Sequence, residues 1–426
     1  MKKSKIILTG TMLAGALAMQ STISNAQSGP AADPVSKDEI RPFKVHVPQS
    51  DLDELRHLIL TTRWPEKETV DDQSQGVQLL TMQKLANYWT TGYDWRKAEA
   101  KLNTLPQFMT TIDGLDIYFI HVRSKEPNAL PVIITHGWPG SIFEILDMIG
   151  PLTNPTAYGG KSEDAFDVVI PAMPGYGFSG KPTAAGWNTD RIARAWDVLM
   201  KRLGYTRYVS QGGDWGARIS EGLARLAPKG LLAVHMNLLL NYPPEVIRAT
   251  ALGEPAPASF SDKEKFAYDQ RKAINPIGYF VMQARRPQTI GYSLAEAPVG
   301  LAAFLLDHDP HSYEQAVHAF DGNPDGNLTR DEILNNITLY WLTNTGSSAA
   351  KLYWESTRNV YKGEVNFPAA YTVFPGEVYR VPRSWVEYTF KNLIYFHEVD
   401  KGGHFASWEQ PQLMAEEMRA AFKSVR

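Results

Sequence analysis

The sequence has no cysteine, which excludes disulfides, thiolate metal sites and a cysteine nucleophile. It also lacks a strong excess of either charge, since the formal net charge is −3, and it has no basic stripe interleaved with aromatic residues. These two absences argue against a nucleic-acid partner. What is present, 43% hydrophobic and 21% charged residues over 426 positions, is ordinary for a globular protein that can bury a full core.

The N-terminus has the three parts of a secretory signal: three lysines, an apolar run at 6–19 and a polar stretch that ends at Ala26. We therefore predict a signal peptide over 1–26, cleaved after Ala26, and an exported protein that is periplasmic or secreted. The apolar run is too short to span a membrane comfortably, so no stable span is expected after cleavage. An uncleaved N-terminal anchor is the alternative. Export without disulfides favours a bacterial periplasm over an animal extracellular space.

The remaining chain divides by its hydrophobic patterns. Residues 27–37 read as a disordered leader and residues 38–104 as a mostly helical lobe. Over 105–236 short apolar strands alternate with helices, which is typical of a doubly wound, mostly parallel sheet. Only helical patterns occur over 237–369, and the strand pattern returns over 370–426. The fold class is therefore predicted to be α/β, with a helical cap inserted into the core.

A glycine-rich corner at 211–217 connects the β-rich run Thr206–Ser210 to the helical stretch Arg218–Leu226. A strand, a tight turn and a helix form the nucleophile elbow of α/β-hydrolases, whose central residue is usually serine. Here the central residue is Asp214. A carboxylate that attacks an alkyl carbon forms an ester, which water can cleave, whereas serine would form a stable ether. Asp214 thus predicts displacement at a carbon with a strained or good leaving group.

A base and an acid from later strand ends would complete a triad with Asp214. His404 follows the last predicted strand and lies between two glycines and a phenylalanine, and we interpret it as the base. Glu377 follows the predicted strand 372–374 in a turn suited to orienting that base. We favour it over Asp400, which lies only four residues before His404.

The segment that begins His136-Gly137-Trp138-Pro139 follows an early core strand, where this fold places its oxyanion-hole loop. Backbone N–H groups of Trp138 and Trp215 could hold an oxyanion on Asp214 while water cleaves the ester. The two indole rings could equally be pocket walls. His136 is expected to brace the loop rather than to take part in catalysis.

Taken together, these motifs resemble the microsomal-type epoxide hydrolases. His-Gly-Trp-Pro-Gly-Ser, Gly-Gly-Asp-Trp-Gly, Phe-Pro-Gly-Glu and Gly-Gly-His-Phe-Ala occur in the family's order, behind an N-terminal helical lobe, over roughly residues 38–424. The resemblance implies two cap tyrosines that hydrogen-bond the epoxide oxygen, and Tyr279 and Tyr353 match these positions. The leader is similar to that of bacterial exported members rather than to the membrane anchor of mammalian relatives.

The resemblance implies a reaction in two steps. Asp214 attacks an epoxide carbon while Tyr279 and Tyr353 donate to the oxygen, and His404, oriented by Glu377, then activates the water that releases a diol. No metal and no organic cofactor is required. The implied partner is a small-molecule epoxide, and an aromatic-rich chain with an apolar cap favours a hydrophobic one. Whether the chain forms a homo-oligomer is left open.

Two other functions compete with this interpretation. A haloalkane dehalogenase shares the aspartate elbow and would need N–H donors for its halide, such as the indoles of Trp138 and Trp215. A catalytically silent binding protein could retain the pocket. The paired tyrosines and the N-terminal lobe favour the epoxide hydrolase.

The segment 321–332 fits the calcium-loop pattern of EF-hands. Against calcium, Pro324 interrupts the loop, and Thr329 with Glu332 predicts a capping box that would occupy the carboxylate. We therefore expect a loop of the cap and no metal site.

Overall fold

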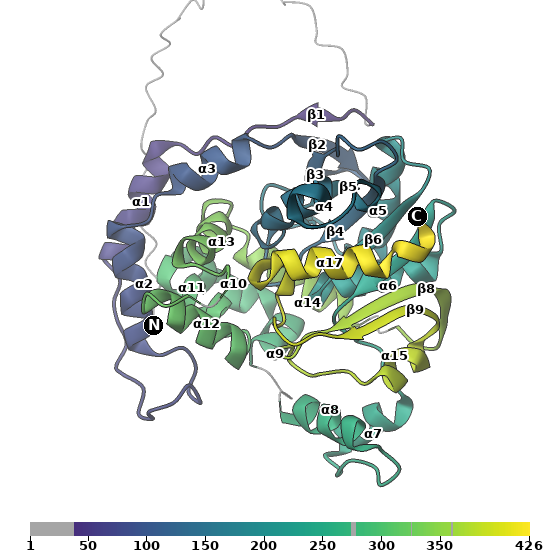
Figure 1. Ribbon diagram of the computed structural model, residues 1–426. Coiled ribbons are helices and arrows are strands. Elements are labelled where there is room, and N and C mark those ends of the chain that lie inside the picture. Colours follow the sequence, from purple (N-terminus) through teal and green to yellow (C-terminus); the bar gives the residue numbers. More distant parts are fainter. Residues whose placement is uncertain (1–37, 274–277, 325, 359–360) are drawn as a thin grey trace, which may run out of the picture. The chain divides into compact units, whose positions relative to one another are not determined.

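A nine-stranded mixed sheet crosses the described part of the chain, which in this computed structural model comprises residues 38–273, 278–324, 326–358 and 361–426 (Figure 1). The predicted signal peptide and leader lie outside these residues. The strand order is β1-β2-β3-β5-β4-β6-β7-β8-β9. Pairing is antiparallel from β1 to β5 and parallel from β5 to β9. The strands are β1 (Arg41–Pro42), β2 (Gln107–Ile112), β3 (Leu115–Val122), β4 (Leu130–Thr135), β5 (Phe166–Pro171), β6 (Tyr208–Gly212), β7 (Leu231–Met236), β8 (Val365–Val373) and β9 (Phe390–Glu398).

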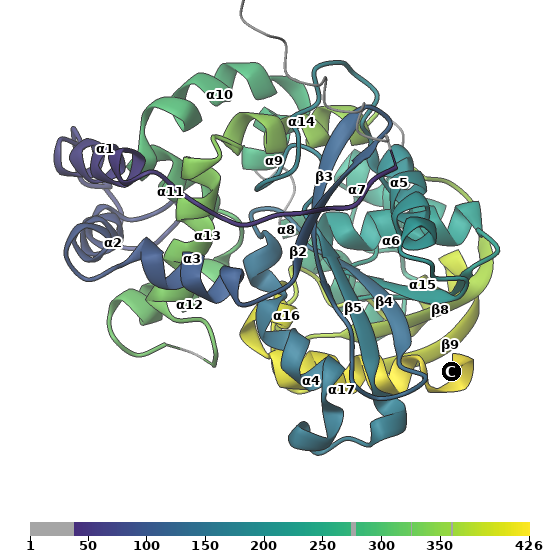
Figure 2. The ribbon, with the colours of Figure 1, turned by 90° about the horizontal axis from the view of Figure 1, so that it is seen from above.

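The central strands are buried on both faces, which explains their continuous apolar sequences. Side chains alternate along them, so Ile133 and Val169 join one hydrophobic cluster, and Val132, Ile134 and Val168 join another. The first cluster includes side chains of α5 (Thr189–Arg202) and α6 (Asp214–Leu226), and the second those of α4 (Ile149–Thr153) and α17 (Pro411–Ala421). Figure 2 shows these helix pairs on opposite sides of the sheet. The predicted α/β-hydrolase fold class is confirmed.

The hairpin of β2 and β3 was only half predicted, because the pattern over 115–122 indicates a strand and the stretch 107–112 was not recognised as one. A signal for it is present. Asp113 and Gly114 both have positive φ angles, 52° and 80°, and Asp-Gly is a strong signal for a two-residue hairpin turn. The antiparallel edge of the sheet therefore begins at β2, with β1 paired outside it.

Between β7 and β8 the chain forms a helical cap, as predicted. Its helices are α7 (Pro244–Leu252), α8 (Asp262–Ala273), α9 (Gly278–Arg285), α10 (Pro287–Glu296), α11 (Pro298–Leu306), α12 (Pro310–Phe320), α13 (Arg330–Leu342) and α14 (Gly346–Ser356). The sequence patterns missed α7 and α10, in which β-branched residues and, in α10, a glycine weaken the helical signal. The last cap helix, α14, ends at Ser356.

The predicted boundary between the cap and the second part of the core is wrong by a few residues. Strand β8 begins at Val365, which pairs with Phe390, so 365–369 belong to the sheet and not to the cap. Pro368 hid this strand, since proline argues against a strand interior. The sheet accommodates the proline with a register shift between Val365 and Pro368. After β8 follow α15 (Arg383–Thr389), β9, α16 (Ala406–Glu409) and α17.

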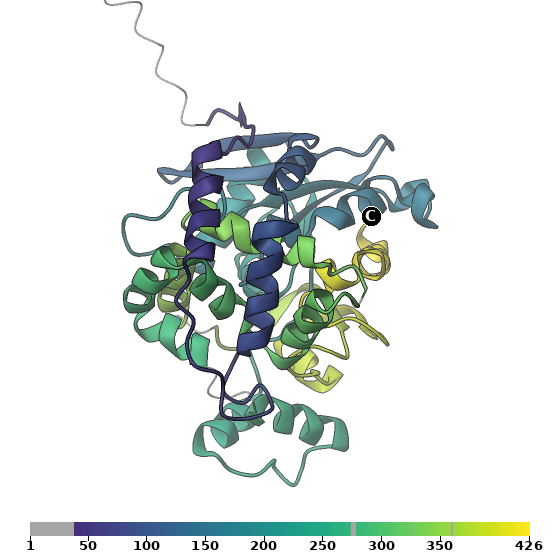
Figure 3. The same ribbon diagram turned by 90° about the vertical axis from the view of Figure 1, so that its left-hand side faces the viewer.

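The N-terminal lobe consists of α1 (Gln49–Leu60), α2 (Leu79–Thr91) and α3 (Trp95–Asn103). Figure 3, viewed from the side of the lobe, shows α1 and α2 side by side in front of the cap helices. Trp89 Nε1 donates to Thr338 Oγ1 at 2.9 Å, and the Tyr93 hydroxyl donates to Asn335 Oδ1 at 2.9 Å. The lobe thus binds α13 of the cap directly. No helix within the described ranges is both long and apolar enough to cross a membrane.

Candidate active site

The elbow places Asp214 at the point where β6 ends and α6 begins. Its φ angle is 44°, a left-handed conformation that non-glycine residues rarely adopt. A Cβ at Gly212 would overlap the backbone of Gly216, and a Cβ at Gly216 would overlap the carbonyl oxygen of Thr135. Glycine at both positions therefore lets strand and helix approach closely enough to project the Asp214 side chain into the site.

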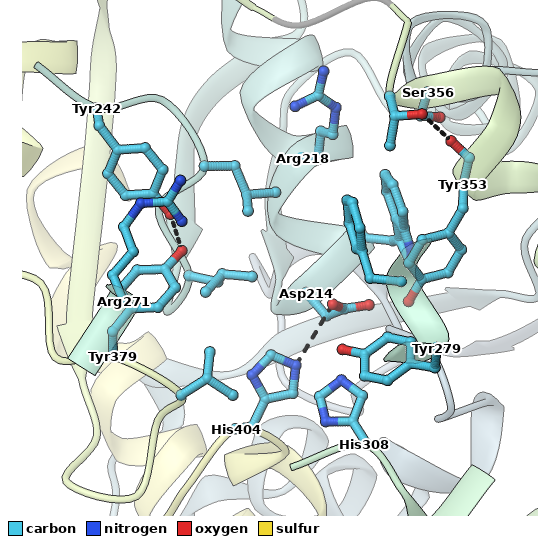
Figure 4. Close-up of a pocket in the computed structure, with 16 residues that line it drawn as sticks. Asp214, Arg218, Tyr242, Arg271, Tyr279, His308, Tyr353, Ser356, Tyr379 and His404 are labelled. Carbon is cyan, nitrogen blue, oxygen red and sulfur yellow. Dashed lines mark hydrogen bonds and ion pairs between the residues drawn. The ribbon is translucent and has the colours of Figure 1, made fainter. Parts of the chain in front are cut away.

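The three predicted triad residues lie together. His404 Nε2 is 3.6 Å from Asp214 Oδ2, and His404 Nδ1 is hydrogen-bonded to Glu377 Oε1 (Figure 4 shows the first contact). The Glu377 and His404 side chains are only 1% and 2% exposed, while Asp214 is 15% exposed. Asp400, the alternative acid, is exposed to solvent. Glu377 is thus the carboxylate that orients His404.

Charge coupling sets the protonation of this group. Burial alone would lower the pKa of the His404 imidazole, but the charges of Glu377 and Asp214 outweigh it and raise that pKa well above its usual value. Burial alone would raise the pKa of Asp214, but His404 and the Trp138 N–H outweigh it and lower that pKa. Asp214 is therefore ionised near neutral pH and paired with an imidazolium.

The loop after β4 holds one oxygen of Asp214. The N–H of Trp138 donates to Asp214 Oδ1 at 2.7 Å. The second predicted donor was the N–H of Trp215. Among the described residues it makes no hydrogen bond to Asp214. His136 is fully buried and braces the loop as expected, because its Nε2 accepts from the Met173 N–H and its Nδ1 bonds the Gly137 carbonyl.

Both predicted cap tyrosines lie at the site. Tyr279 on α9 and Tyr353 on α14 direct their hydroxyl groups toward Asp214 (Figure 4). Their rings pack against the Trp138 indole, with centroids 4.7 and 5.6 Å apart from it. Burial, together with the Asp214 charge, raises the pKa of both phenols well above the usual value, so both remain proton donors. The Trp215 ring packs edge-on against Tyr353 at 4.6 Å and lines the pocket.

A cavity of about 430 Å³ opens above Asp214. Its wall is largely apolar and aromatic, and it includes Leu238, Leu240, Phe280 and Val378. Such a cavity is of the size that holds a small organic molecule, and its polar lining includes Arg218 and Arg271 in addition to the groups around Asp214.

Three residues near the triad were not singled out from the sequence. Asn237, directly after β7, donates through Nδ2 to Glu377 Oε2 and to the His404 carbonyl, both at 3.3 Å. Its position after a strand end was the available signal. Glu144 accepts from the Gly137 N–H at 3.0 Å and from the Ser407 hydroxyl at 2.8 Å. His308 lines the cavity beside His404, and no sequence pattern marked it.

Candidate metal ligands in the described ranges form one group. A ring nitrogen of His308, one of His404 and a carboxylate oxygen of Asp214 lie within 4.8 Å of one another. In the segment that fits the calcium-loop pattern, the Glu332 carboxylate forms an ion pair with Lys101 at 3.3 Å. The backbone N–H of Glu332 donates to Thr329 Oγ1 at 3.3 Å. The Glu332 carboxylate thus forms an ion pair with Lys101 and does not complete the predicted capping box. Asp325 of that loop lies outside the described residues.

Comparison with known proteins identifies relatives over almost the whole described chain. Residues 40–145 match the family "Epoxide hydrolase N terminus" and residues 131–267 the family "alpha/beta hydrolase fold". A protein of Stigmatella aurantiaca, whose name places it among the epoxide hydrolases, is 50% identical over 392 residues, which cover 91% of this chain and 86% of that protein. Epoxide hydrolase 1 of Sus scrofa is 33% identical over 411 residues, which cover 92% and 90%.

Solved structures of epoxide hydrolases superpose on most of the chain. The juvenile hormone epoxide hydrolase of the silkworm Bombyx mori superposes with a TM-score of 0.79 at 26% identity, covering 91% of this chain and 94% of that one. The epoxide hydrolase of Aspergillus niger superposes with a TM-score of 0.75 at 30% identity, covering 91% and 97%.

The buried Glu144 predicts a pH-dependent stability. Burial raises the pKa of its carboxyl from 4.5 to about 7. The folded state therefore binds more protons than the unfolded state between these values, and the contribution of Glu144 to stability falls as the pH rises through this window. In Glu144→Gln that loss disappears. The free energy of unfolding is measured by urea denaturation at pH 4.5 and pH 8 for both proteins. The difference between Glu144→Gln and wild type should be about 1–3 kcal/mol more in favour of the variant at pH 8 than at pH 4.5.

The control is Glu163→Gln, whose side chain is 71% exposed and which should shift stability equally at both pH values. An effect of Glu144→Gln that is the same at both pH values would contradict the raised pKa.

Proposed function

Because the chain belongs to the microsomal-type epoxide hydrolase family, we propose that it forms its diol through a covalent ester on Asp214. The protein is an epoxide hydrolase, a hydrolase that adds water to an epoxide. The observation that supports the ester is that the two carboxylate oxygens of Asp214 have different surroundings. Its Oδ1 is held by the Trp138 N–H, while its Oδ2 lies at the cavity beside His404.

In the first step a carboxylate oxygen of Asp214 forms a bond to an epoxide carbon, and the carbon–oxygen bond of the ring breaks. The electron pair of that bond moves to the epoxide oxygen, which would carry a full charge in an apolar cavity without a donor. Tyr279 and Tyr353 donate hydrogen bonds to it, and one of them supplies the proton. A hydroxyalkyl ester of Asp214 results.

The ester changes the basicity of His404. While Asp214 is ionised, its charge helps to raise the pKa of the imidazole. The ester is neutral, so this part of the stabilisation of the imidazolium is lost and the pKa of His404 falls. The ring then releases its proton, which restores the phenol of the tyrosine that protonated the alkoxide, and can act as a general base with Glu377 still fixing its orientation.

In the second step His404 takes a proton from water, and the water oxygen attacks the carboxyl carbon of Asp214. The Trp138 N–H holds the resulting oxyanion. The ester bond to the substrate then breaks, and the leaving alkoxide receives the proton from His404. Asp214 is left as a carboxylic acid, whose proton passes to neutral His404 and restores the ion pair of the free enzyme as the diol is released. None of these steps uses a metal or an organic cofactor.

The cavity favours a hydrophobic epoxide. Leucine, valine, phenylalanine, tryptophan and tyrosine side chains form most of its wall, and burying an apolar substituent against them contributes roughly 25 cal/mol per Å². We therefore propose a small epoxide with an apolar substituent as substrate.

The covalent step predicts the fate of oxygen in a single turnover. The enzyme in excess is mixed with styrene oxide in water enriched in heavy oxygen, and diol and peptides are analysed by mass spectrometry. The diol should be unlabelled, because its new oxygen comes from the carboxylate, and the peptide that contains Asp214 should gain the label. Label in the diol of the first turnover would mean direct attack by water and would overturn the ester mechanism.

The tyrosine pair predicts an effect on ring opening. Tyr279→Phe and Tyr353→Phe should each lower kcat/KM by about 100-fold, since one donor to the developing oxyanion is lost, and the double variant should lose more. Tyr313→Phe is the matched control, because its hydroxyl is buried in contacts with Gln78 and Thr81 away from the cavity. Steady-state kinetics on styrene oxide measures all four. Equal kinetics of Tyr279→Phe and the control would remove the proposed role.

For the N-terminus we propose export, with cleavage after Ala26, supported by the lysine-led apolar run and its polar end. Expressed in a bacterium, the full chain should be recovered from the periplasm or the medium with an intact mass that corresponds to a start at Gln27. A variant without residues 1–26 should remain in the cytoplasm. Recovery of a membrane-bound protein that retains Met1 would favour the uncleaved anchor instead.

A further inference from the structure

His308 forms a second histidine–carboxylate pair beside the triad. Its Nδ1 lies 2.7 Å from Asp309 Oδ2, and the two side chains are only 2% and 3% exposed. Asp309 is itself fixed, because its Oδ1 accepts the Ser312 N–H at 2.9 Å and caps α12. The His308 ring is held between the ring of Tyr279, stacked at 5.2 Å, and the ring of His404 at 4.7 Å. Figure 4 shows it beside His404 and Tyr279, on the side of the cavity where Asp214 lies.

The carboxylate determines which nitrogen of His308 carries the proton. Asp309 has a lowered pKa because its hydrogen bonds with His308 and Ser312 help to outweigh its burial, so it is ionised and can only accept. The Nδ1 of His308 is then the donor, and in the neutral ring Nε2 has a free lone pair. Glu377 fixes the same arrangement in His404. Once the ester has removed the charge of Asp214 and His404 has lost its proton, the two neutral rings present two acceptor nitrogens to one cavity.

The described part of the protein supplies neither of these nitrogens with a hydrogen bond, although His404 Nε2 lies 3.6 Å from Asp214 Oδ2 in the ion pair of the free enzyme. The Nε2 atoms of His308 and His404 are both buried, and neither makes a hydrogen bond to any residue of the described ranges. A buried polar atom normally has a partner, because leaving it unpaired costs about 1–3 kcal/mol. Both side chains line the cavity above Asp214, so the partner has to come from the contents of that cavity.

The spacing allows one water molecule to contact all three groups. A ring nitrogen of each histidine and a carboxylate oxygen of Asp214 lie within 4.8 Å of one another. Two acceptors that each bind one proton of the same water, at about 2.9 Å, stand about 4.6 Å apart. A water held in this way has both protons engaged, so its lone pairs face the third member of the group, the carboxyl of Asp214.

We infer that His308 is the second of two histidines that hold the hydrolytic water of the ester-cleaving step. The inference rests on the proposed ester on Asp214. One proton of the water passes to His404 Nε2 as the oxygen bonds to the carboxyl carbon. The other stays on the oxygen, hydrogen-bonded to His308 Nε2, which neither gains nor loses a proton. His308 thus orients the water, while His404 remains the base.

Separate measurement of the two half-reactions tests this role. Enzyme and styrene oxide are mixed, quenched with acid at millisecond intervals, and the ester on the Asp214 peptide is quantified by mass spectrometry. His308→Phe keeps a ring in the stack but removes the acceptor. It should slow ester hydrolysis about tenfold, the effect of one lost hydrogen bond, and leave ester formation unchanged, so that ester accumulates.

Asp309→Asn tests which nitrogen of His308 carries the proton, and it changes no residue that lines the cavity. The amide oxygen can still cap α12, while its N–H group donates to His308 Nδ1 and moves the ring proton to Nε2, which then cannot accept from water. Ester hydrolysis should slow by a similar factor. Asp307→Asn is the matched control, with the same change one residue on the other side of His308, and it should leave both half-reactions unchanged. His308→Gln, whose amide oxygen can accept a proton of the water, should recover part of the hydrolysis rate.

The outcomes separate the inference from the mechanism beneath it. Equal ester hydrolysis in His308→Phe, Asp309→Asn and wild type would overturn the role of His308 while leaving the ester intact. A parallel loss of both half-reactions would mean that His308 only supports the site structurally, and would also overturn it. Absence of any ester on Asp214 in wild type would remove the proposed mechanism, and this inference with it.

Discussion

The Asp214 carboxylate and the His404 imidazolium hold each other in their charged forms in a largely buried site, and the remaining active-site features depend on that pair. A buried charge is costly unless it is paired, so in the proposed mechanism the nucleophile is kept ionised by the residue that later acts as base. The same coupling orders the reaction, since His404 is held protonated while Asp214 is free and becomes a base once an ester has removed the charge of Asp214. Glu377 keeps the ring in one orientation through both states.

This pair requires a backbone that few sequences permit. Asp214 has a left-handed φ angle, and the close contact of Gly216 with the Thr135 carbonyl leaves no space for a Cβ. One end of β4 supplies the loop that carries the Trp138 N–H, and the end of β6 supplies the elbow. Because these strands are parallel neighbours, their ends meet at one edge of the sheet, and hydrogen-bond donor and nucleophile come together without any flexible connection.

Residues in local motifs were predictable from the sequence, because a tight turn imposes its own residue types. Asp214, His404 and Glu377 each follow a strand end, and the structure brings all three together. Strand β2 and the start of β8 were missed, the first despite its Asp-Gly turn and the second because Pro368 interrupts it. Asn237 and His308 could not be found in this way. Their positions depend on how the cap and strand ends meet in space, and a lone histidine before an aspartate has no distinctive spacing.

The cap contributes more than a cover for the cavity. The core supplies Asp214, His404 and Glu377, whereas the cap supplies both tyrosines and the His308–Asp309 pair. Ring opening and the orientation of water thus depend on how accurately the cap is placed over the core, and a shift of a few tenths of an ångström would weaken several hydrogen bonds together. The N-terminal lobe restrains that placement, since α2 and the segment before α3 hydrogen-bond α13 through Trp89 and Tyr93. The loop carrying Trp138 is tied to the same helix, because Asn336 donates to the Pro139 carbonyl at 2.7 Å. One cap helix therefore connects the lobe to the loop that holds the nucleophile, which gives the lobe a physical role in a reaction that none of its residues touches.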